Sequence, residues 1–106
     1  MHNFQSKQNR KLMVDLGNKG VSFHCVTTQG AYHAGRSWAS IHALLMKLHK
    51  RQKFTDADLS LSVWMQGKEL CLRFRAREWK WQEECRFSPA ETARIMDFLG
   101  RAPNFN

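Results

Sequence analysis

The chain has few cysteines and lacks any long apolar run. No apolar stretch approaches the 18 residues that a membrane-spanning helix needs, so we expect no contact with a membrane. The three cysteines, Cys25, Cys71 and Cys85, include no C-x-x-C pair. Such an odd, sparse set is not a disulfide framework. We therefore expect reduced thiols in an intracellular, cytoplasmic protein.

Sequence signatures of catalysis and of metal binding are also missing. The chain contains no P-loop, no G-x-S-x-G and no H-E-x-x-H motif. His24 and Cys25 are neighbours on a predicted strand and point to opposite faces, which excludes a base and nucleophile pair. The spacing of the histidines makes no ligand set for a metal (His2, His24, His33, His42 and His49). We therefore expect a protein that is not an enzyme, with no cofactor and no metal.

Positive charge is abundant. Seventeen lysines and arginines against nine acidic residues give a formal charge of +8. On so small a body this surplus predicts a positive surface potential and a polyanionic partner, usually nucleic acid. The length of 106 residues and the 42% of apolar residues fit one domain, residues 1–106, with a modest core.

The first half of the chain predicts a basic arm followed by strands and a helix. Residues 1–10 are polar without periodicity and are expected to be a flexible basic arm that orders on binding. Within a first unit at 11–51, apolar alternation predicts two strands around a turn and a third short strand near Tyr32. Ser37 is a predicted N-cap for a helix over about 38–50.

The second half repeats this order at 59–100. Two alternating segments flank Gly67-Lys68, which fits a tight hairpin turn. A third strand follows, and Ser88 begins a capping box with proline at the first helical position, which predicts a helix over 89–99. Residues 101–106 are expected to be a loose tail. The sequence therefore predicts an α+β fold of two β-β-β-α pseudo-repeats, with a curved antiparallel sheet packed against helices.

The hairpin turn fixes a strand register in the second unit. It pairs Val63 with Leu72 and Leu61 with Phe74, so that one face is apolar throughout. A second turn, at Arg77-Glu78 and without a glycine, places Phe74 opposite Trp81 and Arg75 opposite Lys80, a like-charge pair. Trp79 and Trp81 share the parity of Phe87 and are expected in the core.

The opposite face of this sheet is the candidate binding surface. Cationic side chains bind phosphates, and an exposed tryptophan can stack on an unpaired base. The basic end of the first helix is a second candidate that fits a solvated helix end equally well, and the bland alternative for the sheet face is that its cations serve only solubility. The candidate residues are Trp64, Arg73, Arg75, Arg77, Lys80 and Arg86 on the sheet, and Lys50 and Arg51 at the helix end.

The sheet segment LSLSVWMQGKELCLRFRAREWKWQEECRF and the capped helix SPAETARIMDFL, with a fainter copy at residues 12–50, give a layout that resembles two families. These are the purine-rich-element-binding (PUR) repeat proteins and the Whirly proteins. The similarity is one of architecture, without a signature motif, and those families usually have four strands per unit. The resemblance implies single-stranded DNA or RNA bound on the sheet face, and dimerisation through sheets or helices.

The leading hypothesis is a small, basic, non-enzymatic protein that binds single-stranded nucleic acid, with DNA favoured over RNA. The alternative is a protein-interaction module, a small inhibitor or adaptor that docks on an acidic surface of a partner or host enzyme. Exposed sheet edges also predict a homodimer, because unpaired edges tend to be covered by a second chain.

Overall fold

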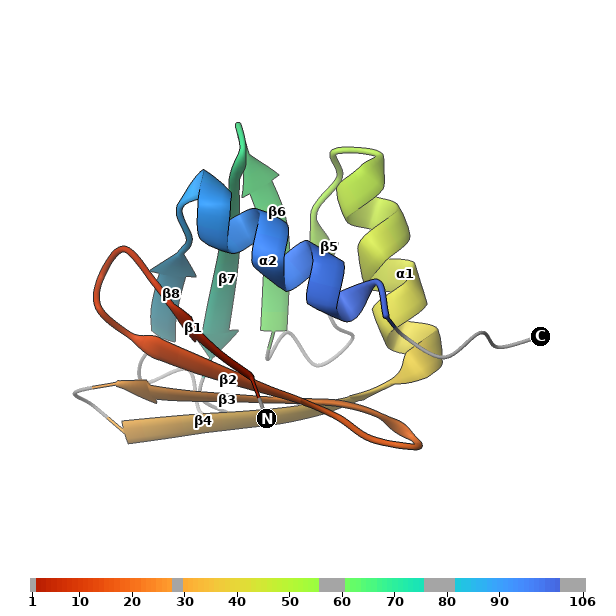
Figure 1. Cartoon of the computed structure of the whole chain (residues 1–106), viewed down its shortest axis with the longest axis horizontal. Helices are drawn as coiled ribbons and strands as arrows, with labels where there is room; N and C mark the ends of the chain where they lie inside the picture. The colour runs from red at the N-terminus through yellow and green to blue at the C-terminus, as the bar shows by residue number, and fades with distance from the viewer. Residues whose placement is uncertain (1, 28–29, 56–60, 76–81, 102–106) are drawn as a thin grey trace.

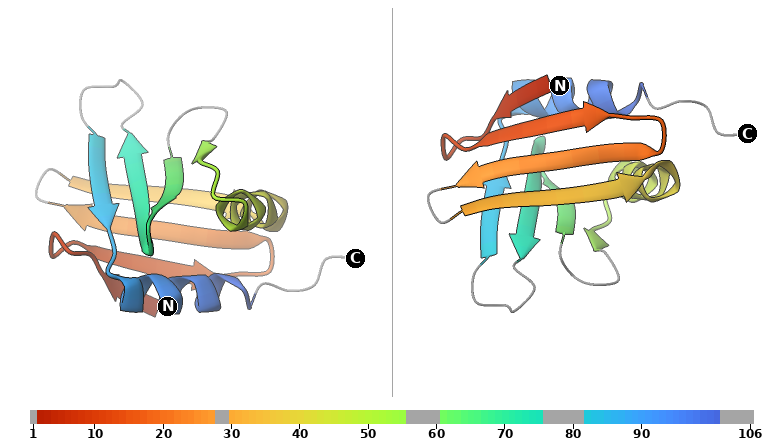
Figure 2. Two further views of the ribbon diagram at one scale, coloured as in Figure 1. Left: turned by 90° about the horizontal axis from the view of Figure 1, so that it is seen from above. Right: turned by 90° about the horizontal axis from the view of Figure 1, so that it is seen from below.

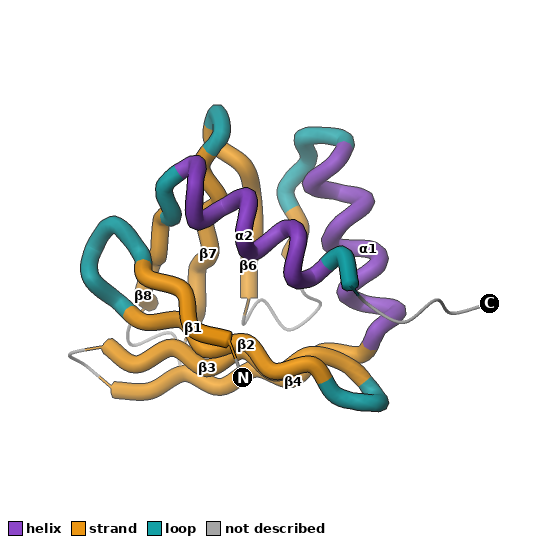
Figure 3. The backbone as a smooth tube through the Cα atoms, viewed as in Figure 1, coloured by secondary structure: helices purple, strands orange, loops and turns teal. Residues whose placement is uncertain are grey.

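The structure of the chain, a computed structural model, contains two antiparallel four-stranded sheets and two helices (Figures 1 and 3). It describes residues 2–27, 30–55, 61–75 and 82–101. The predicted α+β class is confirmed, with four strands in each unit where the sequence indicates three. The first unit comprises β1 (His2–Gln5), β2 (Lys11–Leu16), β3 (Gly20–Thr27), β4 (Gly30–Ser37) and α1 (Trp38–His49). The second comprises β5 (Phe54–Thr55), β6 (Leu61–Gln66), β7 (Glu69–Arg75), β8 (Gln82–Arg86) and α2 (Pro89–Leu99).

The extra strand of the first unit lies in the segment expected to be a flexible arm. That expectation for residues 1–10 is wrong in the described part, because β1 pairs with β2 and places Phe4 opposite Leu12. The Phe4 side chain is buried, and its ring centroid lies 6.0 Å from that of Phe98 on α2. The turn that follows is held by the buried Ser6 hydroxyl, which accepts hydrogen bonds from two backbone amides. A single apolar residue in a polar stretch shows no periodicity, so sequence patterning cannot reveal this strand.

The apolar alternation predicted for the other strands is confirmed by their pairing. Val14 lies opposite Phe23 in the first sheet, and Val63 lies opposite Leu72 in the second. The fourth strand of the second sheet, β5, is only two residues long and pairs Phe54 with Val63. Each sheet is a simple meander in which strands adjacent in the sequence are adjacent in space.

The last strand pairing departs from the prediction. Phe74 lies opposite Glu83, two residues further along the chain than the expected partner Trp81. The connection between β7 and β8 is therefore longer than a tight turn at Arg77-Glu78, and residues 76–81 lie outside the described part. Because the shift is an even number, every β8 side chain keeps its predicted face.

Both helices begin where the capping signals place them. The Ser37 hydroxyl accepts a hydrogen bond from the amide of Ser40, and the Ser88 hydroxyl accepts one from the amide of Glu91. These bonds satisfy amides in the first turn that have no partner within the helix. Pro89 occupies the first turn of α2, where its missing N–H costs nothing.

The two sheets face one another, and the strands of one run across the strands of the other (Figure 2). Their inward side chains form one core together with the buried faces of α1 and α2. A small void of about 10 Å³ lies where both sheets and both helices meet, and its lining includes Leu12, Leu48, Val63 and Ile95. The core is thus close-packed where the layers meet.

The helices pack across the boundary between the units. α2 contacts β7 of its own sheet and also β1 of the first sheet, while α1 contacts β5 and β6 of the second. The sheets are joined directly as well, because Tyr32 on β4 stacks on Phe74 on β7 with a centroid distance of 5.2 Å. Burial and the nearby Glu83 carboxylate raise the pKa of Tyr32 to about 12. Each unit therefore completes the core of the other.

Candidate nucleic-acid interface

The hairpin of β6 and β7 positions the candidate surface. Gly67 has a φ of 62°, a left-handed conformation that glycine adopts without strain. The turn therefore closes at Gly67-Lys68 and sets Gln66 opposite Glu69. This register turns Val63 and Leu72 into the core and the alternate residues to the outside. We call the outward side of β6, β7 and β8 the Trp64 face. Its described residues are Ser62, Trp64, Gln66, Glu69, Cys71, Arg73, Arg75, Gln82, Glu84 and Arg86.

Trp64 lies on this face between cations from neighbouring segments. The Nζ atom of Lys53, just before β5, is 5.0 Å from the centroid of the Trp64 ring. The guanidinium carbon of Arg73 on β7 is 5.1 Å from the same centroid. Both distances are within the range of a cation–π interaction. The tryptophan is therefore partly buried, and the two cations hold it in place on the sheet surface.

Several cations of the face are paired with carboxylates or amides. Arg73 Nη2 lies 3.9 Å from a carboxylate oxygen of Glu84, its cross-strand partner. Arg86 Nη2 donates to the Gln66 amide oxygen at 2.7 Å, and its Nε lies 3.8 Å from Glu69. Glu69 also accepts a 2.8 Å contact from the Nζ atom of Lys7, in the turn after β1. The sequence pattern missed Glu69 as a member of the face because the alternation is clear only from Leu70 onward.

The predicted register position of Arg75, opposite Lys80, is wrong. Arg75 lies opposite Gln82, and its Nε donates to the Gln82 amide oxygen at 3.2 Å. This correction follows from the longer β7–β8 connection. The candidate residues Arg77 and Lys80 fall outside the described residues, as do Trp79 and Trp81, which were expected in the core.

The structure separates the two sets of predicted site residues. Lys50 and Arg51, at the end of α1, line a groove together with Met65. The Met65 side chain points to the opposite side of β6 from Trp64, so these two cations are not part of the Trp64 face. Of the basic residues that follow α1, Lys53 reaches Trp64, although the sequence offered it only as one member of a basic run. Only the register of β5 against β6 identifies it.

The buried thiols are poorly placed for nucleophilic chemistry. The sulfurs of Cys25 on β3 and Cys85 on β8 lie 3.6 Å apart within the core. The hydrogen bond to Cys25 and burial raise the pKa of Cys85. Cys71 is fully buried even though it belongs to the Trp64 face, and its burial raises its pKa. The hydrogen bond with Cys85 lowers the pKa of Cys25, but the Cys25 side chain is fully buried. Since the thiolate is the reactive form and a reagent must reach it, we expect Cys71 and Cys85 to be inert because of their raised pKa values and Cys25 because of its burial.

The chain is thus an α+β protein of two ββββα units, of which the second carries an aromatic and cationic sheet surface. No protein family model, curated protein or solved structure matches the chain. Within the described ranges, no three or more His, Cys, Asp or Glu side chains are grouped to hold a metal ion. Neither α1 nor α2, the helices of the described residues, has the length and apolar character needed to cross a bilayer.

Proposed function

We propose that the chain binds single-stranded nucleic acid on the Trp64 face, with DNA favoured over RNA and without a catalytic step. The observation that carries the proposal is the partly buried Trp64 ring with Lys53 and Arg73 each about 5 Å from its centroid. A base can stack on an aromatic or guanidinium plane while the neighbouring cations contact the phosphates on either side of it. A twisted sheet with such side chains suits a flexible strand, whereas the duplex major groove usually takes a helix.

The ion pairs on the face are weak enough to be exchanged for phosphate contacts. Arg73 and Glu84 are 3.9 Å apart at the surface, and Arg86 and Glu69 are 3.8 Å apart. The four side chains are between 21% and 46% exposed, so water screens these long pairs and each contributes about 0–1 kcal/mol. Each phosphate contact also releases condensed counterions, which favours binding at low salt. The carboxylates therefore orient the arginines in the free protein without preventing them from binding a strand.

The charge balance of the described surface supports the same partner. Cations exceed carboxylates there, because Lys7 and Lys53 add to the arginines of the sheet, whereas the carboxylates of this surface are Glu69 and Glu84. Contacts to four to six phosphates predict a slope of roughly −3 to −4 in a plot of log affinity against log salt concentration.

The test is a titration of a fluorescent 20-mer of deoxythymidine at several salt concentrations. Trp64→Ala should weaken binding by about 1–3 kcal/mol, the contribution of one stacked base. Arg73→Gln should weaken binding and flatten the salt slope by roughly 0.7, one phosphate contact on a single strand. Arg101→Gln is the matched control, because Arg101, just after α2, is exposed and pairs with Asp97 on that helix. The uridine 20-mer should bind more weakly than the DNA.

Absence of binding at low salt would contradict the proposal. If the wild type and Trp64→Ala bind with equal affinity, and circular dichroism shows that both are folded, then the binding site is not on the Trp64 face. The alternative of a protein-interaction module predicts a stoichiometric complex with one protein that survives nuclease treatment.

We also propose a homodimer. The strand β4 ends its sheet and is eight residues long, so it offers a long edge for pairing with a second copy. The other two long edges are engaged in part. At β8, the Arg86 carbonyl accepts from the Lys7 amide and the Arg86 amide donates to the Gln8 side chain, and at β1 the Gln5 amide donates to the Glu91 carboxylate. Light scattering at micromolar concentration should give twice the chain mass of 12.4 kDa, and a mass of one chain would contradict the proposal.

A further inference from the structure

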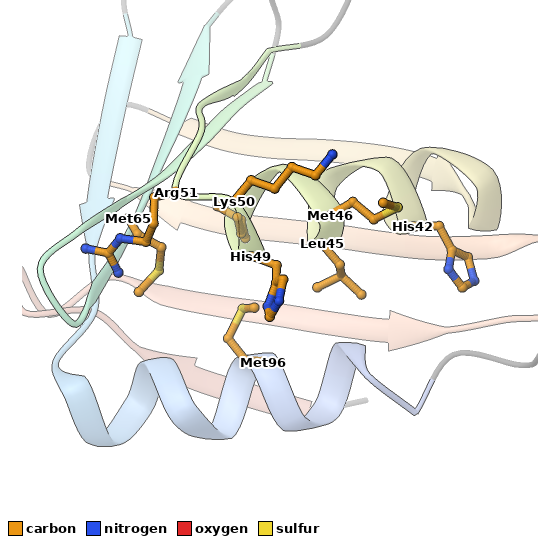
Figure 4. Close-up of a pocket in the computed structure, with 9 residues that line it drawn as sticks. His42, Leu45, Met46, His49, Lys50, Arg51, Met65 and Met96 are labelled. Atoms are coloured by element: carbon orange, nitrogen blue, oxygen red, sulfur yellow. The ribbon is translucent and has the colours of Figure 1, made fainter.

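A groove of about 560 Å³ lies between α1, α2 and the end of β6 (Figure 4). Its apolar lining comes from three elements, with Leu45 and Met46 on α1, Met65 on β6 and Met96 on α2. Figure 4 shows Leu45 and Met96 pointing into the space between the helices, while Met46 lies along the flank of α1. The Met46 side chain is 59% exposed, an unusual position for a large apolar residue. Three of the five methionines of the chain thus gather at one surface.

The polar lining of this methionine groove consists of His42, His49, Lys50 and Arg51. Its charged members are the two cations, Lys50 and Arg51, and no carboxylate lines the groove among the described residues. The carboxylate of Asp97, next to Met96 in the sequence, is engaged by Arg101 at 3.1 Å. A ligand that fits both features must therefore present an apolar surface with acidic groups beside it.

We propose that the methionine groove binds an acidic amphipathic helix of a partner protein. Two helices form its walls, and a third helix can lay large apolar side chains at positions i, i+3 or i+4, and i+7 between them. The flexible methionine side chains adapt to the shape of such anchors. Glutamate and aspartate beside the anchors would lie next to Lys50 and Arg51. A nucleic-acid strand fits less well, because its phosphates would contact an apolar floor that offers them no hydrogen bonds.

This inference does not rest on the proposed nucleic-acid function. Met65 and Trp64 are neighbours on β6 and point to opposite sides of the strand, so the two surfaces are separate. A strand bound on the Trp64 face and a helix bound in the methionine groove would not compete for the same side chains. The two proposals can therefore fail independently.

The test begins with a phage-displayed library of helical peptides of about 16 residues with randomised surface positions, selected against the full chain. Enriched peptides should carry Leu, Met or Phe at i, i+3 or i+4, and i+7, with Glu or Asp between them. A synthetic, fluorescent copy of the most enriched peptide is then titrated by anisotropy. A version with every acidic residue changed to Lys should bind at least tenfold more weakly.

Two variants locate the peptide on the surface. Met46→Glu should weaken its binding at least tenfold while leaving the melting temperature nearly unchanged, because the side chain is exposed. Lys50→Glu should weaken it about three- to fivefold. Lys47→Glu, the same charge change on the same helix but outside the groove lining, should stay within twofold of the wild type.

Three results would overturn the proposal. The first is a selection that yields no peptide or only basic peptides. The second is equal affinity of the selected peptide for the wild type and for Met46→Glu. The third is displacement of the peptide by the deoxythymidine 20-mer from the wild type but not from Trp64→Ala, which would indicate one shared site.

Discussion

The ion pair between Arg10 and Glu83 ties the first unit to the second, and its removal gives a sharp test of the packing. Glu83 points inward from β8 and is only 7% exposed. Arg10, just before β2, places Nη2 at 2.8 Å from the Glu83 carboxylate. Its Nη1 also donates to the carbonyl of Glu84 at 2.7 Å. The carboxylate is therefore buried against one cation that comes from the other unit.

Arg10→Ala leaves the Glu83 carboxylate buried without this cation. Breaking a fully buried pair in this way costs about 3–5 kcal/mol of unfolding free energy. The Arg10 side chain is 27% exposed, so water screens part of the charge and we expect about 2–3 kcal/mol. Glu83→Gln removes the charge and keeps the shape, and should cost only about 1 kcal/mol. The double variant should be more stable than the two single losses predict when added together, with a coupling of roughly 1–2 kcal/mol.

Urea unfolding followed by circular dichroism at neutral pH measures all three variants. For a domain of this size, the loss in Arg10→Ala corresponds to a fall of roughly 10–20 °C in melting temperature. Arg101→Ala is the matched control, since its pair with Asp97 is exposed and should contribute less than about 0.5 kcal/mol. Equal losses for Arg10→Ala and Arg101→Ala, or strictly additive effects of the two changes, would refute this account of the pair.

Three further outcomes are expected. Phe4→Ala should cost about 3–5 kcal/mol in urea unfolding, because the ring is buried under α2, whereas a flexible arm would tolerate the change. The Gln5 amide and Arg94 hold the pKa of Glu91 below its ordinary value. The ionised carboxylate therefore stabilises the fold fully above the ordinary pKa, and this contribution is lost as the pH falls through the lowered pKa. Glu91→Gln should be less stable than the wild type in urea unfolding at neutral pH and equally stable in acid. The single tyrosine, Tyr32, has a raised pKa and should titrate near pH 12 when followed by its ultraviolet absorbance. The stability linked to its neutral form is present below pH 10 and is lost as the pH rises toward 12. Titration at pH 10 in the folded protein would contradict its burial.

The parts of the fold that sequence patterning predicts are those with a repeated local signal. Alternation around Gly67 fixes the β6–β7 register, and the capping residue Ser88 places the start of α2. The sequence does not predict β1, because Phe4 is its only buried side chain, and it does not predict β5, because two residues are too few to show an alternation. The register of β7 against β8 was misjudged because nothing in the sequence marks the length of the connection.

The candidate site shows the same division. Strand parity places Trp64, Arg73 and Arg86 on one face without any knowledge of the tertiary structure. The contact of Lys53 with Trp64 depends on the short strand β5, and the methionine groove depends on how α1 and α2 lie beside the end of β6. Residues that become neighbours only when separate helices and strands pack together show no periodic pattern in the sequence, so sequence patterning cannot predict their contacts.

The exchange of helix contacts between the units has a consequence for how the chain assembles. A single ββββα unit has one inward sheet face and one helix, and each is covered in part by the other unit: α1 contacts β5 and β6 besides its own β3 and β4, and α2 contacts β1 besides its own β7. Separated halves would thus behave as the two subunits of an obligate dimer, unfolded alone and folded when mixed. Covalent linkage makes their encounter intramolecular, with an effective concentration in the millimolar range for a short connection. Folding of the intact chain then proceeds equally well in dilute solution, where the same two halves, unlinked, would dissociate and unfold.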